Sequence, residues 1–373
     1  MMSGFSGHGF RPYTAVMVVP TGVGAAIGGY AGDALPAARV VASVVDRLIT
    51  HPNVMNGAQL YWPLPNALYV EGYGLDQFAA GRWGLRPVHR NRIGLVLDAA
   101  IEDDLRGRHI QAAEATRATL GLDLRDYVIT DAPLGVTLRQ AESGATWGTL
   151  ERPDSLLRAA EKAIAAGADA IAVVARFPDD EDEADVETLQ NYRLGQGVDL
   201  VAGAEAVISH LVVRRFGVPC AHAPALSPLP LDPLVSPKAA AEEIGYTFLP
   251  CVLAGLSRAP QFVTRGDRGA GDMWADQVDA IVVPASACGG GAVLSLSRTH
   301  TLVIAVADNT TTLNVPLTAL GGSPVTVASY LEAVGVIAAH RAGVHPQALT
   351  PQVPHLAPWI TPRTASVLPQ NTP

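Results

Sequence analysis

Apolar positions along the chain follow two patterns, short continuous runs and longer stretches with one apolar face. The first run, residues 15–19, predicts a buried strand that stops at Pro20. After a glycine-rich loop, Asp33 is placed to cap a helix over residues 34–49, where apolar residues recur at i, i+3, i+4 and i+7. The start of the chain is therefore expected to form a strand, a loop and a helix.

The same alternation continues through the rest of the chain. Further strands are expected at residues 67–70, 92–97, 127–130, 135–138, 170–175, 280–283, 302–306 and 325–328. Further helices are expected at residues 102–120, 154–165, 203–216, 292–297 and 330–342, with another that starts at Ser236. Alternating strands and helices favour parallel sheets. The expected fold is α/β, with mostly parallel sheets covered by helices and two lobes that form a cleft at the C-terminal ends of the strands.

Composition indicates the domain organisation. The 373 residues are enough for two or three cores. An acidic run at residues 178–187, PDDEDEADVE, is typical of a solvated loop and marks a boundary. We expect a flexible arm at 1–13, a lobe with the glycine-rich loop at 14–177, a second lobe at 188–346 and a proline-rich extended tail at 347–373.

Charge and hydropathy narrow the classes of partner. Apolar residues make up 49% of the chain and charged residues 16%, which is typical of a globular protein. The formal net charge of −9 argues against nucleic acid, and no apolar run is long enough for a membrane span. Three cysteines are too few for a disulfide scaffold. We expect a cytoplasmic protein with a small-molecule ligand, and homo-oligomer formation is left open.

Two glycine clusters follow predicted strands, where open parallel sheets bind ligands. The first contains Gly22, Gly24, Gly28 and Gly29, and the second contains Ser286, Gly289 and Gly290. Free N–H groups in such loops can hold an anion. The first loop is not a dinucleotide fingerprint, because its third glycine comes one position too late. The alternative is a pair of tight turns without a ligand.

Cys288 lies between Ser286 and three glycines, at the expected start of a helix. The dipole of a helix lowers the pKa of a thiol at its start, which favours a nucleophile or an acid–base group. The alternative is an inert buried cysteine.

A second group of chemically active residues contains His210, Cys220 and His222. On an extended segment Cys220 and His222 point to the same side, which suits a Cys/His pair or a metal ligand pair. Metal binding would need distant partners such as His51 or Asp308. Two other roles of the histidines are left open, general acid–base catalysis and a structural role in the core.

Polar residues at loops and strand ends are further candidates for ligand binding. Arg258 is flanked by apolar sequence, a context typical of an arginine that holds a carboxylate or phosphate. Candidates that can donate or accept hydrogen bonds are His51, Asn53, Asp308, Asn309 and Thr310. Turn capping is the alternative for the strand-end residues. Glu242 and Glu243 share a helix face with Tyr246, a pattern that a surface helix also shows.

Several segments resemble an uncharacterised bacterial family, known as a domain of unknown function in cyanobacteria and related lineages. They include PTGVGAAIGGYAGDA, LITHPNV, GAEAVISHLVVRRFGVPCAHAPAL, AAEEIGYTFLPCVLAGLSRAP and VIAVADNTTTL. The resemblance runs from Thr14 to about Leu349 and implies one enzyme-sized unit, without an activity or residue roles. The segment TLVIAVADN alone is similar to a strand and turn of phosphate acyltransferases.

We expect an enzyme, a hydrolase or isomerase, that acts on a small anionic or carbonyl-containing metabolite. Cys288 or Cys220 would be the nucleophile or acid–base group, and His222 and His210 would move protons. Arg258 and the glycine loops would hold the anion. No cofactor is expected, and a divalent metal is left open. The alternatives are a transferase for a phosphorylated or CoA-type ligand and a non-catalytic metabolite-binding protein.

Overall fold

A computed structural model describes residues 11–56, 60–178, 183–227, 229–245, 248–353 and 355–356. Most of the expected arm at 1–13 and of the expected tail at 347–373 lies outside these ranges. Tyr246 and residues 179–182 of the acidic run also lie outside them.

The first sheet has six parallel strands from both ends of the chain. Its order is β14 (Val325–Val327), β13 (Leu302–Val306), β12 (Ala280–Pro284), β1 (Thr14–Met17), β2 (Arg47–Thr50) and β3 (Ala67–Tyr69). Ala15 pairs with Ala280 on one side and with Leu48 on the other. In chain order this is the doubly wound arrangement, with its switch point between β1 and β12. The first glycine cluster therefore follows β1 and the second follows β12, the two central strands.

The second sheet has four parallel strands from the middle of the chain. Its order is β10 (Cys220–Ala225), β9 (Ala170–Arg176), β5 (Arg92–Leu97) and β6 (Asp123–Ile129). Two antiparallel pairs complete the strands: β4 (Gly84–Arg86) with β11 (Gln261–Val263), and β7 (Val136–Gln140) with β8 (Thr146–Leu150). The two sheets are not divided at the expected domain boundary between residues 177 and 188. Strands β1–β3 precede this boundary and β12–β14 follow it, but the pairing of β1 with β12 joins them in one sheet.

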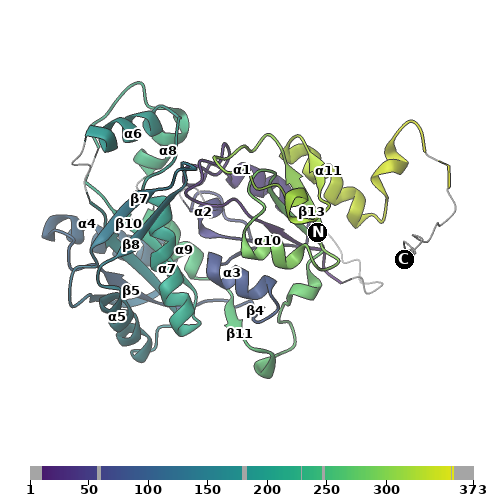
Figure 1. The fold of residues 1–373 in the computed structure, drawn as a ribbon. Coiled ribbons are helices and arrows are strands. Elements are labelled where there is room, and N and C mark those ends of the chain that lie inside the picture. Colours follow the sequence, from purple (N-terminus) through teal and green to yellow (C-terminus); the bar gives the residue numbers. More distant parts are fainter. Residues whose placement is uncertain are drawn as a thin grey trace, which may run out of the picture.

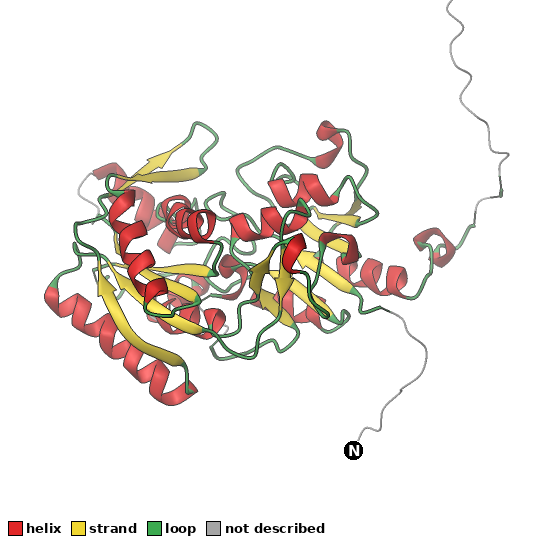
Figure 2. Ribbon diagram, turned by 90° about the horizontal axis from the view of Figure 1, so that it is seen from below, coloured by secondary structure: helices red, strands yellow, loops and turns green. Residues whose placement is uncertain are grey.

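Helices cover both sheets (Figures 1 and 2). They are α1 (Leu35–Ala42), α2 (Pro52–Met55), α3 (Gly72–Ala79), α4 (Asp103–Leu120), α5 (Pro153–Ala165), α6 (Glu183–Arg193), α7 (Ala202–Phe216), α8 (Pro237–Gly245), α9 (Phe248–Leu256), α10 (Gly291–Leu296) and α11 (Tyr330–Arg341). Short 3₁₀ turns lie at Arg265–Asp267, Ala275–Gln277, Leu317–Leu320 and Pro346–Leu349. The expected α/β class with mostly parallel sheets is confirmed.

The strands of the six-stranded sheet are buried on both faces because successive side chains point to opposite sides. Ala15 and Met17 join a core with α1, α9 and α11, whereas Val16 joins a second core with α3 and α10. The first core continues through α9 onto one face of the four-stranded sheet. Helices α5 and α7 cover the other face of that sheet. One continuous core therefore links the two sheets.

The expected helix over residues 34–49 is wrong in its second half. Helix α1 ends at Ala42, and the chain then enters β2, in which Leu48 and Ile49 are fully buried. The apolar residues near the end of the segment serve the strand, which pairs with β1 and β3. A periodic pattern cannot reveal this division because the pairing partners lie elsewhere in the chain.

Candidate functional site

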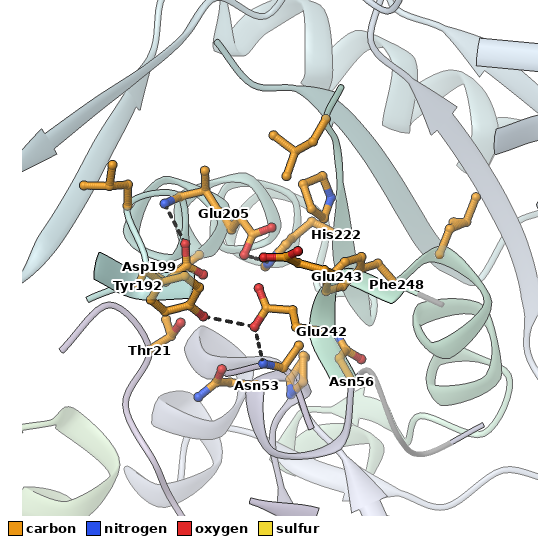
Figure 3. Close-up of a pocket in the computed structure, with 18 of the residues that line it drawn as sticks. Thr21, Asn53, Asn56, Tyr192, Asp199, Glu205, His222, Glu242, Glu243 and Phe248 are labelled. Atoms are coloured by element: carbon orange, nitrogen blue, oxygen red, sulfur yellow. Dashed lines mark hydrogen bonds and ion pairs between the residues drawn. The ribbon is translucent and has the colours of Figure 1, made fainter. Parts of the chain in front are cut away.

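A cavity of about 860 Å³ lies at the C-terminal ends of strands from both sheets. The six-stranded sheet contributes His51 and Glu71, which follow β2 and β3. The four-stranded sheet contributes His222 from β10. Helix α7 contributes Glu205, and Ser209 and His210 lie about one turn further along the same helix. Residues of α6 and α8, two helices that contact each other, line another side (Figures 1 and 3). Cavities at such strand ends are the usual ligand sites of parallel sheets.

Carboxyl groups from three elements gather in this cavity (Figure 3). Asp199 precedes α7 and accepts a hydrogen bond from the Val201 N–H at 3.0 Å. Glu242 of α8 accepts hydrogen bonds through Oε2 from the Ala31 N–H at 2.8 Å and the Tyr192 hydroxyl at 3.0 Å. Burial raises the pKa of Glu242 to about 7 and the pKa of Asp199 well above its usual range, and repulsion among the neighbouring carboxylates raises both further. Both carboxyl groups can therefore hold a proton that an exposed carboxylate would lose.

His222 is held between two residues of α7. Its Nδ1 lies 3.1 Å from Ser209 Oγ, and its Nε2 lies 3.7 Å from Glu205 Oε2. Glu205 and Ser209 are four residues apart and therefore share one face of the helix. A histidine that a hydroxyl group orients and that lies beside a carboxylate is suited to general acid–base chemistry.

A second pair of a histidine and a glutamate, His210 and Glu71, also lines the cavity. Glu71 accepts hydrogen bonds from the Tyr73 and Gly74 N–H groups, which caps α3, and its other oxygen forms an ion pair with His210 Nδ1. Burial lowers the pKa of His210, but the hydrogen bond and charge of Glu71 outweigh it, so the pKa is raised overall. His210 is therefore a cationic group in the wall of the cavity over a wider pH range than an isolated histidine.

The first glycine loop binds groups of the protein itself. Gly28 N–H donates to Asp33 Oδ1 at 2.6 Å, and Ala31 N–H donates to Glu242. A Cβ on Gly22, which has φ +69°, would lie 2.7 Å from Thr146 Oγ1, so the loop is packed tightly against β8. The group that the loop holds is thus the carboxyl group of Glu242, which it fixes in the cavity.

Two expected ligand-binding residues line the cavity but bond to the same loop. His51 Nε2 accepts a hydrogen bond from Val19 N–H at 3.0 Å, and burial lowers its pKa to about 4. Asn53 Nδ2 donates to the carbonyl oxygens of Val19 at 3.2 Å and Gly28 at 2.8 Å. Both side chains hold the loop in place, and His51 remains neutral at physiological pH.

Neither expected catalytic cysteine lines the cavity. Cys288 and Cys220 are 0% and 1% exposed, and burial raises the pKa of both thiols. The expected lowering of the pKa of Cys288 is wrong, because α10 begins only at Gly291 and the thiol faces the carbonyl oxygens of Pro284 and Ala285. Both cysteines are parts of the core.

Of the first glycine cluster only Gly29 lines this cavity, and the remaining expected binding residues lie outside its lining. Arg258 is exposed after the end of α9, and Asp308 and Thr310 are exposed after β13. Asn309 is fully buried and bonds to Ile27 and Tyr330. Ser286 Oγ lies 2.9 Å from Thr311 Oγ1 in the second glycine cluster, which contains Gly289 and Gly290. The structure therefore does not bring the two glycine clusters into one cavity.

Glu71 and three further residues of the cavity were not expected from the sequence. Asp199 precedes a helix and is there a typical cap, Glu205 lies within that helix, and Tyr192 lies near the acidic run. The local sequence around each is ordinary, and only the folded chain places them together. Across the described ranges, no group of three or more His, Cys, Asp or Glu is arranged to hold a metal ion. The same ranges contain no helix long and apolar enough to cross a bilayer.

The raised pKa of Glu242 predicts a pH-dependent stability that Glu242→Gln removes. The folded protein holds this proton up to about pH 7, whereas the unfolded chain releases it near pH 4.5. The carboxyl group therefore contributes stability that is fully present below pH 4.5 and is lost as the pH rises to 7. From pH 4.5 to pH 7, the free energy of unfolding of Glu242→Gln minus that of the wild type should therefore rise by about 2 kcal/mol.

Urea unfolding at several pH values measures this difference. The matched control is Glu161→Gln, at an exposed glutamate of α5, and its curve should follow that of the wild type. Parallel curves for Glu242→Gln and wild type from pH 4.5 to 7 would contradict the prediction.

Comparison with known proteins gives a family and a relative. The family model described as "Protein of unknown function (DUF3326)" matches residues 14–350. A Synechococcus protein named an uncharacterized lipoprotein is 62% identical over 341 residues, which cover 91% of this chain and 94% of the relative. No solved structure matches the chain significantly. The resemblance inferred from the sequence is confirmed, whereas the expected cytoplasmic location is contradicted by the name of the relative.

Proposed function

The chain belongs to the DUF3326 family, and from the cavity of this member we propose an enzyme that carries out acid–base chemistry on a small carbonyl-containing molecule. The reaction class is isomerisation or hydrolysis. One observation carries the proposal: His222, which lies 3.7 Å from the carboxylate of Glu205, and a carboxyl group with a pKa of about 7 line the same cavity. Pairs of titratable groups with shifted pKa values are typical of catalytic sites.

His222 is the proposed general base. Ser209 holds the ring in position through Nδ1, which leaves Nε2 to accept a proton, and Glu205 lies 3.7 Å from Nε2. In an isomerisation, His222 would take a proton from the carbon beside the carbonyl group. In a hydrolysis, it would take a proton from the attacking water.

Glu242 is the proposed general acid. Its protonated form would donate to the carbonyl oxygen as negative charge develops there, which gives an enol in the isomerisation. The Ala31 N–H and the Tyr192 hydroxyl stabilise the carboxylate that remains. Tyr192 stacks on Tyr30 at 4.4 Å, so this hydrogen bond comes from a fixed ring.

The lining of the cavity favours this function over the alternatives left open by the sequence. A cavity that only binds a metabolite needs no strongly shifted titratable groups, but this one contains two, Asp199 and Glu242. A transferase that holds a phosphate on the first glycine loop needs N–H groups that here bond to Asp33 and Glu242. The acidic lining also favours a neutral or cationic substrate over an anionic one.

Exchange of carbon-bound protons for deuterium tests the proposal even though the substrate is unidentified. A panel of small ketones, aldehydes and esters is incubated with the protein in D₂O, and NMR follows exchange next to the carbonyl group and ester cleavage. For any compound that reacts, His222→Gln and Glu242→Gln should each lower kcat/KM by about 100-fold, the usual contribution of an acid or base.

The matched control is His89→Gln, at an exposed histidine outside the cavity, and it should keep the wild-type rate. Wild-type rates in both cavity variants, or a loss of rate in Cys288→Ala alone, would overturn the proposal.

A further inference from the structure

The carboxyl groups in the cavity wall differ in their partners. Glu71 pairs with His210, Glu205 lies 3.7 Å from His222, and Glu243 pairs with Arg193 at 2.8 Å. In the part of the chain that the structure describes, Asp199 and Glu242 form no such ion pair, although both accept hydrogen bonds. A carboxylate has about four acceptor positions, so Asp199 can accept a further hydrogen bond from a cationic ligand, whose charge favours the ionised form.

The rest of the wall is mainly apolar. Leu189 of α6, Leu226 and Leu229 after β10 and Phe248 of α9 all line the cavity. Figure 3 shows Phe248 and Asp199 on opposite sides of it. An apolar chain could therefore extend from the carboxyl groups along this wall.

Large apolar side chains are also exposed at the mouth. Leu231 and Val186 line the cavity and are 93% and 42% exposed, and Leu229 is 41% exposed. Isolated exposed leucines are common, but a group around the mouth of an apolar cavity is typical of a site that binds apolar ligands. Arg108 of α4 also lines the cavity, but it is exposed and its charge is hydrated.

We propose that the cavity binds an amphiphilic amine, with the ammonium group against Asp199 and the apolar chain along the leucines toward the mouth, so that Glu242 keeps the proton that it would donate as the general acid. Charge complementarity carries this choice of ligand, because Asp199 has no cationic partner among the described residues and a bound ammonium group would favour its ionised form. The inference rests on the proposed function in one respect: the substrate of the enzyme would be a carbonyl compound that bears such an amine.

Binding of octylamine, octanol and octanoate tests the inference by calorimetry at one pH and ionic strength. The three probes share one apolar chain and differ only in the head group. Octylamine should bind at least tenfold more tightly than octanol, since a charged hydrogen bond gives more than that factor, and octanoate should bind most weakly. Equal affinities, a preference for octanoate or no binding of octylamine would overturn the inference.

Two variants locate the ligand. Asp199→Asn should remove the preference for octylamine and retain the affinity for octanol, and Leu229→Ser should weaken the binding of both probes. The comparison of probes on the wild-type protein decides the question even if a variant does not fold. These probes need no turnover, so octylamine binding without proton exchange would overturn the acid–base proposal alone. Exchange without octylamine binding would overturn this inference alone.

Discussion

Replacement of Asp98 by alanine should lower the free energy of unfolding by about 4 kcal/mol. Asp98 follows β5 at the centre of the four-stranded sheet and is 0% exposed. Its two oxygens accept hydrogen bonds from the N–H groups of Ala100 at 3.0 Å, Leu134 at 3.0 Å and Arg176 at 3.2 Å. Alanine leaves all three donors without this acceptor, and each buried unsatisfied donor costs about 1–3 kcal/mol.

Urea unfolding followed by circular dichroism measures this loss. Asp98→Asn is the matched variant, because it keeps one oxygen for two of the three donors and should lose about half as much. The three N–H groups belong to separate segments around β5, β7 and β9, so the effect reports on the position where these segments meet. A loss below about 1 kcal/mol in Asp98→Ala would show that water replaces the carboxylate there.

Replacement of Gly203 by alanine should lower the free energy of unfolding by about 3 kcal/mol. Alanine in a helix is ordinarily more favourable than glycine by about 1 kcal/mol. Here a Cβ would lie 2.1 Å from the carbonyl oxygen of Thr146 and 2.5 Å from Trp147 Cα. These are backbone atoms of β8, so the contact is relieved only by moving the helix or the strand, and overpacking outweighs the helix propensity.

Gly107 provides the matched control. It lies in α4, and nothing lies within 4 Å of the position that a Cβ would take. Gly107→Ala should therefore raise the free energy of unfolding by about 0.5–1 kcal/mol. Opposite signs for the two substitutions in thermal or urea unfolding are the expected result, and an increase in stability for Gly203→Ala would contradict the packing of α7 on β8.

The consequences of Gly203→Ala extend to the candidate site. Thr146 Oγ1 donates to the carbonyl oxygen of Asp199 at 2.9 Å, and Thr146 N–H donates to the carbonyl oxygen of Gly22 at 2.8 Å. Strand β8 thus connects the first glycine loop with the segment that carries Asp199. The tight packing of glycines around Thr146 is one reason why the cavity keeps its shape.

His210 and His222, both expected from the sequence, line the cavity. The sequence places His222 just after an apolar run and His210 on an amphipathic helix, although in the structure His222 is the third of the six residues of β10. The same reasoning failed for Cys288, because a turn that looks like the start of a helix can equally be a buried turn. Only the depth of burial, which neighbouring segments determine, separates the two cases.

The sequence by itself determined the α/β class, because buried parallel strands are continuous apolar runs and the helices between them show a 3.6-residue period. It also determined that a tight loop follows β1, since Gly22, Gly24 and Gly28 have positive φ values that other residues rarely adopt. The tertiary structure decided what that loop holds. The pairing of β1 with β12, and the placement of Asp199 and Glu242 in one cavity, depend on contacts between segments far apart in the chain, and the local sequence does not specify these contacts.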